Sequence, residues 1–174
     1  MKSRGIVNGI DSEVWDPVTD PYLTHKMTSD LAAFKGANKQ EICAATGLNA
    51  DLPLIIFIGR LVSEKGALLI PDAVRQYLSH GQNVNFYILG SGINYIEDQL
   101  NDCAYHFSNN CSVYIGYNEA LAHKLYAAAD FLLMPSLVEP CGLNQLYAMR
   151  YGTVPIVRKV GGLKDTVKDI GEWQ

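Results

Sequence analysis

The stretch GRLVSEKG, residues 59–66, holds two cations, Arg60 and Lys65, between two glycines. It follows an apolar run directly, so we expect Arg60 at the tip of a strand and Lys65 at the start of a helix. Two fixed cations beside free helix-start amides can bind a phosphate group. A phosphate site is therefore one interpretation, and a solvated pair of basic side chains in a loop is the other.

A second stretch, LVEPCGLNQLYAMR at residues 137–150, combines a carboxylate with a predicted helix start at 142–144. Free N–H groups and the helix dipole favour an anion there. Glu139 would repel a phosphate, so it suits sugar hydroxyls or a positive charge developing at a sugar carbon. The alternative is that Glu139 caps the helix, a role Glu fills less well than Asp or Ser. Cys141 lies within reach of such a ligand, but no nearby His activates it, so we interpret it as a packing residue.

Three other strand ends carry glycine. LGSGINY begins like a dinucleotide-binding fingerprint, but Tyr95 stands where the third glycine belongs, which disfavours a nicotinamide or flavin cofactor. The turn at Gly90 either lets a ligand approach the backbone or is a plain tight turn. Tyr117 either stacks on a base or packs in a partly buried position, and packing is the favoured interpretation. Gly161 and Gly162 form either a nest for an oxygen anion or a turn without a ligand.

The elements that must position these residues alternate along the chain. Continuous apolar runs are typical of strands buried on both faces, and they cover 54–59, 85–90, 111–116, 131–134 and 154–157. Helical patterns follow each run, near 69–81, 93–103, 119–129, 143–151 and from about 163. The alternation predicts an α/β fold, a Rossmann-like doubly wound parallel sheet that binds ligands at the carboxyl ends of its strands.

The remaining sequence carries fewer signals. Residues 1–52 are predicted to be an ordered loop with one short helix over 39–46, and 53–174 to be the core domain. Pro71 either kinks its helix or lies in its first turn.

Composition restricts the class of protein. With 174 residues, 48% of them hydrophobic and 18% charged, the chain can form one packed domain. The net charge of −4 and the absence of a Lys/Arg run argue against nucleic-acid binding. No apolar stretch approaches the roughly 20 residues of a membrane helix, so we expect no membrane partner. Four cysteines without CxxC spacing and four scattered histidines argue against a metal site or disulfides.

Several stretches together resemble the bacterial glycogen synthases and plant starch synthases, which are ADP-glucose-using glucan glucosyltransferases. The matching stretches are VNGIDSEVWDP, GRLVSEKG, IGYNEALAHKLYAAAD, PSLVEPCGLNQLYAMRYGTVPIV and GGLKDTV, in family order. The resemblance implies the glycosyltransferase-B architecture of two Rossmann-like domains facing a cleft. This chain is similar to the C-terminal, donor-binding domain, truncated before its final helices, and would need the missing N-terminal domain for activity.

The resemblance also implies roles for individual residues. Arg60 and Lys65 would hold the phosphates of ADP-glucose or ADP, and Glu139 would lie near the transferred glucose. Further donor contacts would come from Asn8, Gly90, Tyr117, Cys141, Gly142, Leu143 and Asn144, with Tyr117 stacking on adenine. KVGGL at 159–163 looks like the family's N-terminal lysine motif but lies in the wrong part of the fold, so Lys159 does not inherit that role. Asn144 stands where bacterial members often have Thr, and a backbone contact should tolerate this.

The expected activity is retaining transfer of glucose from ADP-glucose to the nonreducing end of an α-1,4-glucan, without a metal or other cofactor. One alternative is an enzyme using a UDP-sugar, such as sucrose synthase. Another is a non-catalytic module that binds nucleotide or glucan. The N-terminus lacks a signal-peptide pattern, and the expected location is the cytoplasm, or the plastid if the source is a plant.

Overall fold

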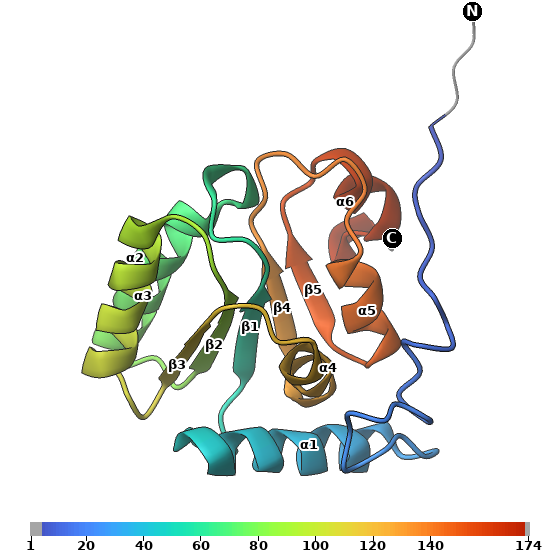
Figure 1. Ribbon diagram of the computed structural model, residues 1–174, viewed down its shortest axis with the longest axis horizontal. Coiled ribbons are helices and arrows are strands. Elements are labelled where there is room, and N and C mark those ends of the chain that lie inside the picture. The colour runs from blue at the N-terminus through green and yellow to red at the C-terminus, as the bar shows by residue number, and fades with distance from the viewer. Residues whose placement is uncertain (1–4, 173–174) are drawn as a thin grey trace, which may run out of the picture.

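The computed structural model describes residues 5–172, and they form one parallel sheet with helices on both faces (Figure 1). The strands run in the order β3-β2-β1-β4-β5, and all neighbours are parallel. Their bounds are β1 Leu54–Ile58, β2 Asn85–Gly90, β3 Cys111–Ile115, β4 Phe131–Met134 and β5 Val154–Val157. This order reverses beside β1, as in doubly wound sheets, and confirms the predicted fold class.

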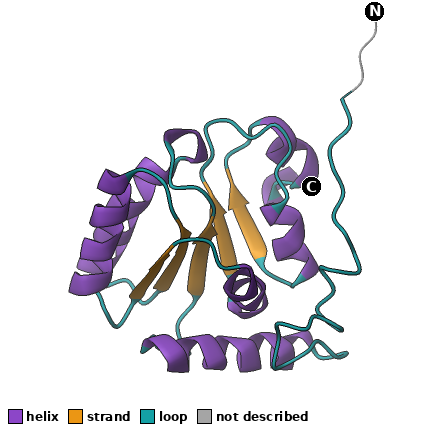
Figure 2. Ribbon diagram, viewed as in Figure 1, coloured by secondary structure: helices purple, strands orange, loops and turns teal. Residues whose placement is uncertain are grey.

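The helices divide between the two faces of the sheet (Figure 2). Figure 1 shows α2 and α3 together on one side, α4 and α5 on the other, and α1 crossing near the amino ends of the strands. Their bounds are α1 Leu31–Thr46, α2 Ile70–Ser79, α3 Asn94–His106, α4 Glu119–Ala128, α5 Asn144–Arg150 and α6 Gly161–Thr166. Short 3₁₀ turns lie at Ser63–Lys65, Ala67–Leu69 and Ile170–Glu172. Within the described residues, no helix is long and apolar enough to span a membrane.

Each face of the sheet has its own hydrophobic core. Successive side chains of a strand point to opposite faces, so the strands contribute to both cores. Ile56 and Leu132 pack with Leu125 of α4 in one core. Ile88 packs with Leu100 of α3 in the other. Burial on both sides explains why the strands were recognisable as continuous apolar runs.

The first helix is much longer than predicted. It begins at Leu31 and not near residue 39, and the carboxylate of Asp30 caps it by accepting a hydrogen bond from the amide of Ala33 at 3.0 Å. It ends as expected before Gly47, whose φ is 79°. The open question about the second helix is also answered, because Pro71 lies in the first turn of α2, where its missing N–H removes no helical hydrogen bond.

Candidate functional site

The loops that follow β1 and β4 are fastened to each other at the carboxyl edge of the sheet. The carbonyl of Glu64 accepts hydrogen bonds from the amides of Leu137 at 2.8 Å and Val138 at 3.2 Å. Gly66 has a φ of 68°, and a Cβ atom there would collide with the carbonyl oxygen of Pro135. The close approach therefore needs glycine at this position, and it brings the predicted phosphate loop against the loop that carries the acid.

Lys65 and Glu139 meet where these loops touch. The Nζ atom of Lys65 donates to Oε2 of Glu139 at 2.5 Å, and the hydroxyl of Ser136 donates to the same oxygen at 3.3 Å. Glu139 is 7% exposed. No side chain caps the start of α5, so the interpretation of Glu139 as a helix cap is wrong. The sequence assigned the lysine and the acid to different parts of a ligand, but their direct contact was not foreseen.

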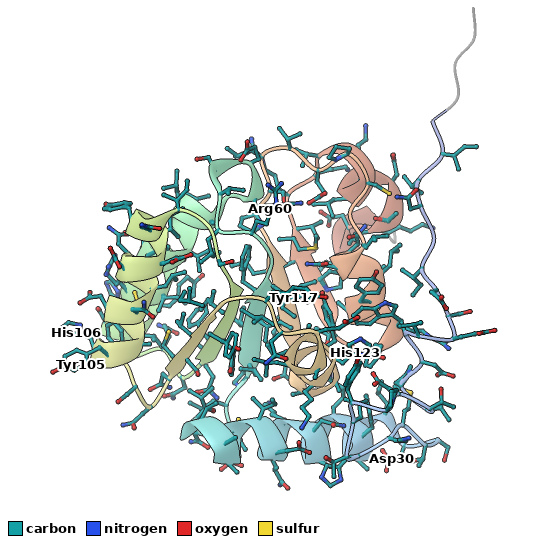
Figure 3. The ribbon with its side chains drawn as sticks, in the orientation of Figure 1. Asp30, Arg60, Tyr105, His106, Tyr117 and His123 are labelled. Carbon is teal, nitrogen blue, oxygen red and sulfur yellow. The ribbon has the colours of Figure 1, made fainter. Side chains whose placement is uncertain are left out.

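Two neighbouring pockets share the end of β1. One, of about 240 Å³, is lined by Arg60, Lys65, Glu139 and residues 142–144. The other, of about 330 Å³, also includes Arg60 and extends to the ends of β2 and β3. Arg60 is exposed and lies at the end of β1 in Figure 3. The structure thus brings the predicted phosphate-binding and sugar-binding residues into one continuous site.

Gly90 lies in the wall of the larger pocket, where the ends of β1 and β2 come close together. A Cβ atom on Gly90 would collide with the carbonyl oxygen of Gly59. On one side of this contact the amide of Gly59 donates to the carbonyl of Leu89 at 3.0 Å, and on the other the amide of Leu61 donates to the carbonyl of Ser91 at 2.9 Å. Packing of the two backbones therefore requires this glycine, which also lines the pocket.

Tyr117 stands at the larger pocket and is 84% exposed, so the favoured interpretation of a packing tyrosine is wrong. Figure 3 shows it between Arg60 and His123 in this view. The charge of the Glu119 carboxylate raises the pKa of the Tyr117 hydroxyl. The next residue, Asn118, caps α4 by accepting a hydrogen bond from the amide of Leu121 at 2.9 Å. An exposed ring beside an apolar pocket suits stacking on a base, which stays a prediction.

The start of α5 lies between the two pockets. Among the described hydrogen bonds, the amides of Gly142, Leu143 and Asn144 have no acceptor. The side chain of Asn144 donates to the carbonyl of Ile58 at 2.6 Å. Sequence reasoning considered only the backbone of Asn144 and missed this contact, which ties the helix start to the strand end that precedes Arg60.

The other two predicted site residues touch each other. The backbone amide of Asn8 donates to Sγ of Cys141 at 3.0 Å, so the N-terminal segment reaches the loop that carries Glu139. Asn8 is exposed and Cys141 is half-buried. Neither residue lines the two pockets. Their predicted contacts with a donor stay predictions.

The glycine pair that begins α6, Gly161 and Gly162, packs against the same loop. The amide of Gly162 donates to the carbonyl of Glu139 at 2.9 Å. A Cβ on Gly161 would collide with that carbonyl, and one on Gly162 with the carbonyl of Cys141. Because the Gly162 amide is already bonded to the protein, the pair acts as a packing surface, which favours the second of the two interpretations made from the sequence.

The remaining titratable groups do not add a reactive centre. Cys43, Cys103 and Cys111 are buried, and burial raises the pKa of each thiol, for Cys111 to about 12. In the range 5–172, no three or more His, Cys, Asp or Glu side chains are grouped in a way that could hold a metal ion. Arg60, Lys65 and Glu139 are the charged side chains that line the smaller pocket together.

Residues 38–171 match the proteins described as glycosyl transferases group 1. The chain belongs to this family. Among the group 1 glycosyl transferases, it is 50% identical over 173 residues to a glycogen synthase from Flavobacterium johnsoniae. It is 45% identical over 167 residues to a glycogen synthase from Thermodesulfovibrio yellowstonii. These matches cover 98% and 95% of this chain but only 37% and 33% of the relatives, so the chain spans about a third of their length.

A solved structure of the same kind supports this assignment. The catalytic domain of starch synthase IV from Arabidopsis thaliana, bound to ADP and acarbose, superposes with a TM-score of 0.86 and is 40% identical. The match covers 95% of this chain and 34% of that domain. The resemblance to glycogen and starch synthases that the motifs indicated is confirmed, together with the Rossmann-like fold of a group 1 glycosyl transferase.

Proposed function

We propose that this chain is the donor-binding part of a retaining glucosyltransferase that moves glucose from ADP-glucose to the nonreducing end of an α-1,4-glucan. The observation that carries the proposal is the continuous site in which Arg60, Lys65, Glu139 and residues 142–144 line adjoining pockets. The amides of 142–144 have no hydrogen-bond acceptor within residues 5–172. The names of its relatives, and the ADP and acarbose bound to the starch synthase, support the same chemistry.

The diphosphate of the donor would lie between Arg60 and the start of α5. When the bond between the sugar C1 and the phosphate oxygen breaks, negative charge develops on the departing ADP. A guanidinium, an ammonium and backbone amides already in place would stabilise that charge without a metal ion. Because Lys65 is bonded to Glu139, it would serve both the phosphate and the acid.

Glu139 would face the glucose. As C1 loses its bond to the phosphate, the sugar ring gains positive charge, and a nearly buried carboxylate beside it would stabilise that charge. The acceptor glucan would supply the hydroxyl oxygen that forms the new bond to C1, and its proton would pass to an oxygen of the departing diphosphate. The rest of the nucleotide would occupy the larger pocket, where Tyr117 is free to stack on the base.

The proposal also requires an acceptor site and a second wall of the cleft, which we place outside this chain. Relatives are about three times as long as this chain, so we assign acceptor binding to their remaining length, which would include the N-terminal domain. A cytoplasmic location stays a prediction. An enzyme using UDP-sugars, or a module that only binds nucleotide, is the competing function.

Titration calorimetry of this chain with ADP and with UDP tests the proposal. ADP should bind more tightly than UDP, and Arg60→Ala should weaken ADP binding by about tenfold or more, because a hydrogen bond to a charged group contributes about 1.5–3 kcal/mol. Arg75→Ala is the matched control, because it removes a cation from α2, where Arg75 pairs with Asp72 and Asp102. Equal binding of both nucleotides, or equal effects of the two arginine variants, would contradict the assignment.

A second experiment separates the enzyme from a binding module. In the full-length enzyme, Glu139→Ala should lower kcat far more than it changes the dissociation constant of ADP, because the carboxylate acts on the sugar. A full-length protein that binds ADP but transfers no glucose to a glucan would support the binding module.

A further inference from the structure

The N-terminal segment contacts both α4 and α5 through the side chain of Trp15. The ring of Trp15 lies between the rings of His123 on α4 and Tyr147 on α5. The centroid distances are 3.8 Å and 3.7 Å, and the interplanar angles are 10° and 16°. Parallel rings at these distances are in direct contact over their faces. Trp15 therefore fills the space between the two helices and touches both.

Asp20 also holds this segment against the two helices, through contacts with His123 and Tyr151. Its side chain is fully buried, and its Oδ2 atom accepts a hydrogen bond from the hydroxyl of Tyr151 at 2.5 Å and contacts Nδ1 of His123 at 2.6 Å. One partner belongs to α4 and the other directly follows α5. A buried carboxylate is costly unless its oxygens are bonded, so breaking either contact would loosen the segment.

The two helices that Trp15 separates both begin at the candidate site. Asn118, the cap of α4, and Asn144, the first residue of α5, line the same pocket. His123 is five residues beyond Asn118, and Tyr147 is three beyond Asn144. At 1.5 Å per residue, Trp15 therefore lies only about one turn from each helix start. A change in helix spacing there would change the width of the pocket.

The other end of the segment contacts a loop that follows β4. Seven residues before Trp15, the backbone amide of Asn8 donates to Sγ of Cys141 in the loop that carries Glu139. Arg150, at the end of α5, adds a bond from Nε to the carbonyl of Trp15 at 3.3 Å. Neither Trp15 nor Asp20 lines either pocket, so any effect that they have on a ligand is indirect.

We propose that Trp15 and Asp20 are positioning residues for donor binding, which set the spacing of α4 and α5 and so the shape of the nucleotide pocket. The inference rests on the proposed function, since it takes ADP to be the ligand of that pocket. It assigns the segment before α1 a part in binding the donor, although this segment contributes no side chain to the pocket. It also predicts that displacement of this segment weakens ADP binding.

Variants of Trp15 test the inference through ADP affinity, measured by calorimetry well below the unfolding temperature of each variant. Trp15→Ala should raise the dissociation constant by about 2-fold to 30-fold, the range for substitutions that act on a site from outside. Trp15→Phe keeps a ring between the helices and should restore most of the affinity. Tyr105→Ala is the control, because this exposed tyrosine lies on α3, at the left edge of the molecule in Figure 3 and far from the labelled His123.

Two further measurements separate positioning from general stability. Tyr147→Leu removes one half of the stack, so it tests the inference even if Trp15→Ala does not fold. In folded variants, the amide NMR signals of Asn118 and Asn144 should shift, whereas those of α3 should not. If folded Trp15→Ala and Tyr147→Leu bind ADP as the unmodified chain does, the inference is wrong and the proposed function stands. If the unmodified chain does not bind ADP, both are wrong.

Discussion

The ammonium of Lys65 and the carboxylate of Glu139 form an ion pair with 2.5 Å between Nζ and Oε2. The two residues come from different loops, after β1 and after β4. Their contact brings the predicted phosphate-binding lysine next to the predicted sugar-binding acid at the edge of the sheet. A diphosphate that binds near Lys65 would have to compete with the Glu139 carboxylate for the positive charge of the lysine. We therefore expect the pair to influence both the affinity for the nucleotide and the position of the acid.

The first prediction concerns nucleotide affinity. Glu139→Gln removes the competing negative charge while keeping the shape of the side chain, so ADP should bind more tightly. Lys65→Ala should weaken binding, since it removes a cation from the phosphate pocket. Calorimetry at low and high salt measures both changes, and the difference between the variants should shrink as salt screens the charges. A weaker ADP complex of Glu139→Gln would contradict this account.

The second prediction concerns stability. Lys65→Met leaves the nearly buried carboxylate of Glu139 without its cation, and losing one partner of a buried pair costs up to about 3–5 kcal/mol. Lys65 is itself partly exposed, so we expect a loss below that range. The double variant Lys65→Met/Glu139→Gln should recover part of it, as measured by urea unfolding. Additive losses in the double variant would show that the pair is not coupled.

The third prediction uses two glycines in the same backbone conformation. Gly66 and Gly47 have φ values of 68° and 79°, so alanine at either position meets the left-handed penalty of roughly 1–2 kcal/mol. Only at Gly66 would the new Cβ collide, with the carbonyl of Pro135, whereas nothing lies within 4 Å at Gly47. Gly66→Ala should therefore lower the free energy of unfolding more than Gly47→Ala, and it should also weaken ADP binding. Thermal unfolding of both variants, with ADP titrations, checks this.

The fourth prediction concerns pH. The Nζ atom of Lys35 donates to the carbonyl of Tyr126 at 3.0 Å and to the hydroxyl of Thr153 at 2.7 Å. Burial lowers its pKa from 10.5 to about 7, against the opposing charge of Asp130. Between about pH 7 and 10.5 the unfolded chain therefore binds the proton and the folded chain does not. Stability contributed by this group rises with pH across that window.

Lys35→Met should remove this contribution. The free energy of unfolding of the unmodified chain minus that of the variant should increase from pH 7 to pH 10, by no more than about 1.4 kcal/mol per pH unit. Lys26→Met, at an exposed lysine, is the control for removal of a surface charge. A difference that stays flat with pH would mean that Lys35 remains protonated inside the fold.

The strands and their ligand edge were predictable because burial on both faces leaves a continuous apolar run in the sequence. The first half of α1 was not, because its buried face includes Phe34 and Ile42 with the polar Asn38 between them. Asn38 is tolerated there since its side-chain amide donates to the carbonyls of His25 and Phe34, each at 2.8 Å. A polar residue at a core position interrupts the repeat of apolar residues by which a helix is recognised in a sequence.

The site was predictable as a set of residues but not as a set of contacts. Arg60, Glu139 and the glycines could be placed at strand ends from their positions after apolar runs. The pairing of Lys65 with Glu139 could not, because 74 residues separate them and the contact depends on how two loops meet. The four histidines were used only as an argument against a metal site, and the contacts of His123 with Trp15 and Asp20 likewise come only from the packing of helices.

The backbone contacts of Gly161 and Gly162 with the carbonyls of Glu139 and Cys141 bear on any redesign of the proposed sugar site. In a library that varies all strand ends equally, substitutions at 161 and 162 would displace the loop that carries Glu139. Such variants would be lost whatever sugar is tested. Diversity is better placed at side chains that face the pockets, with both glycines kept constant.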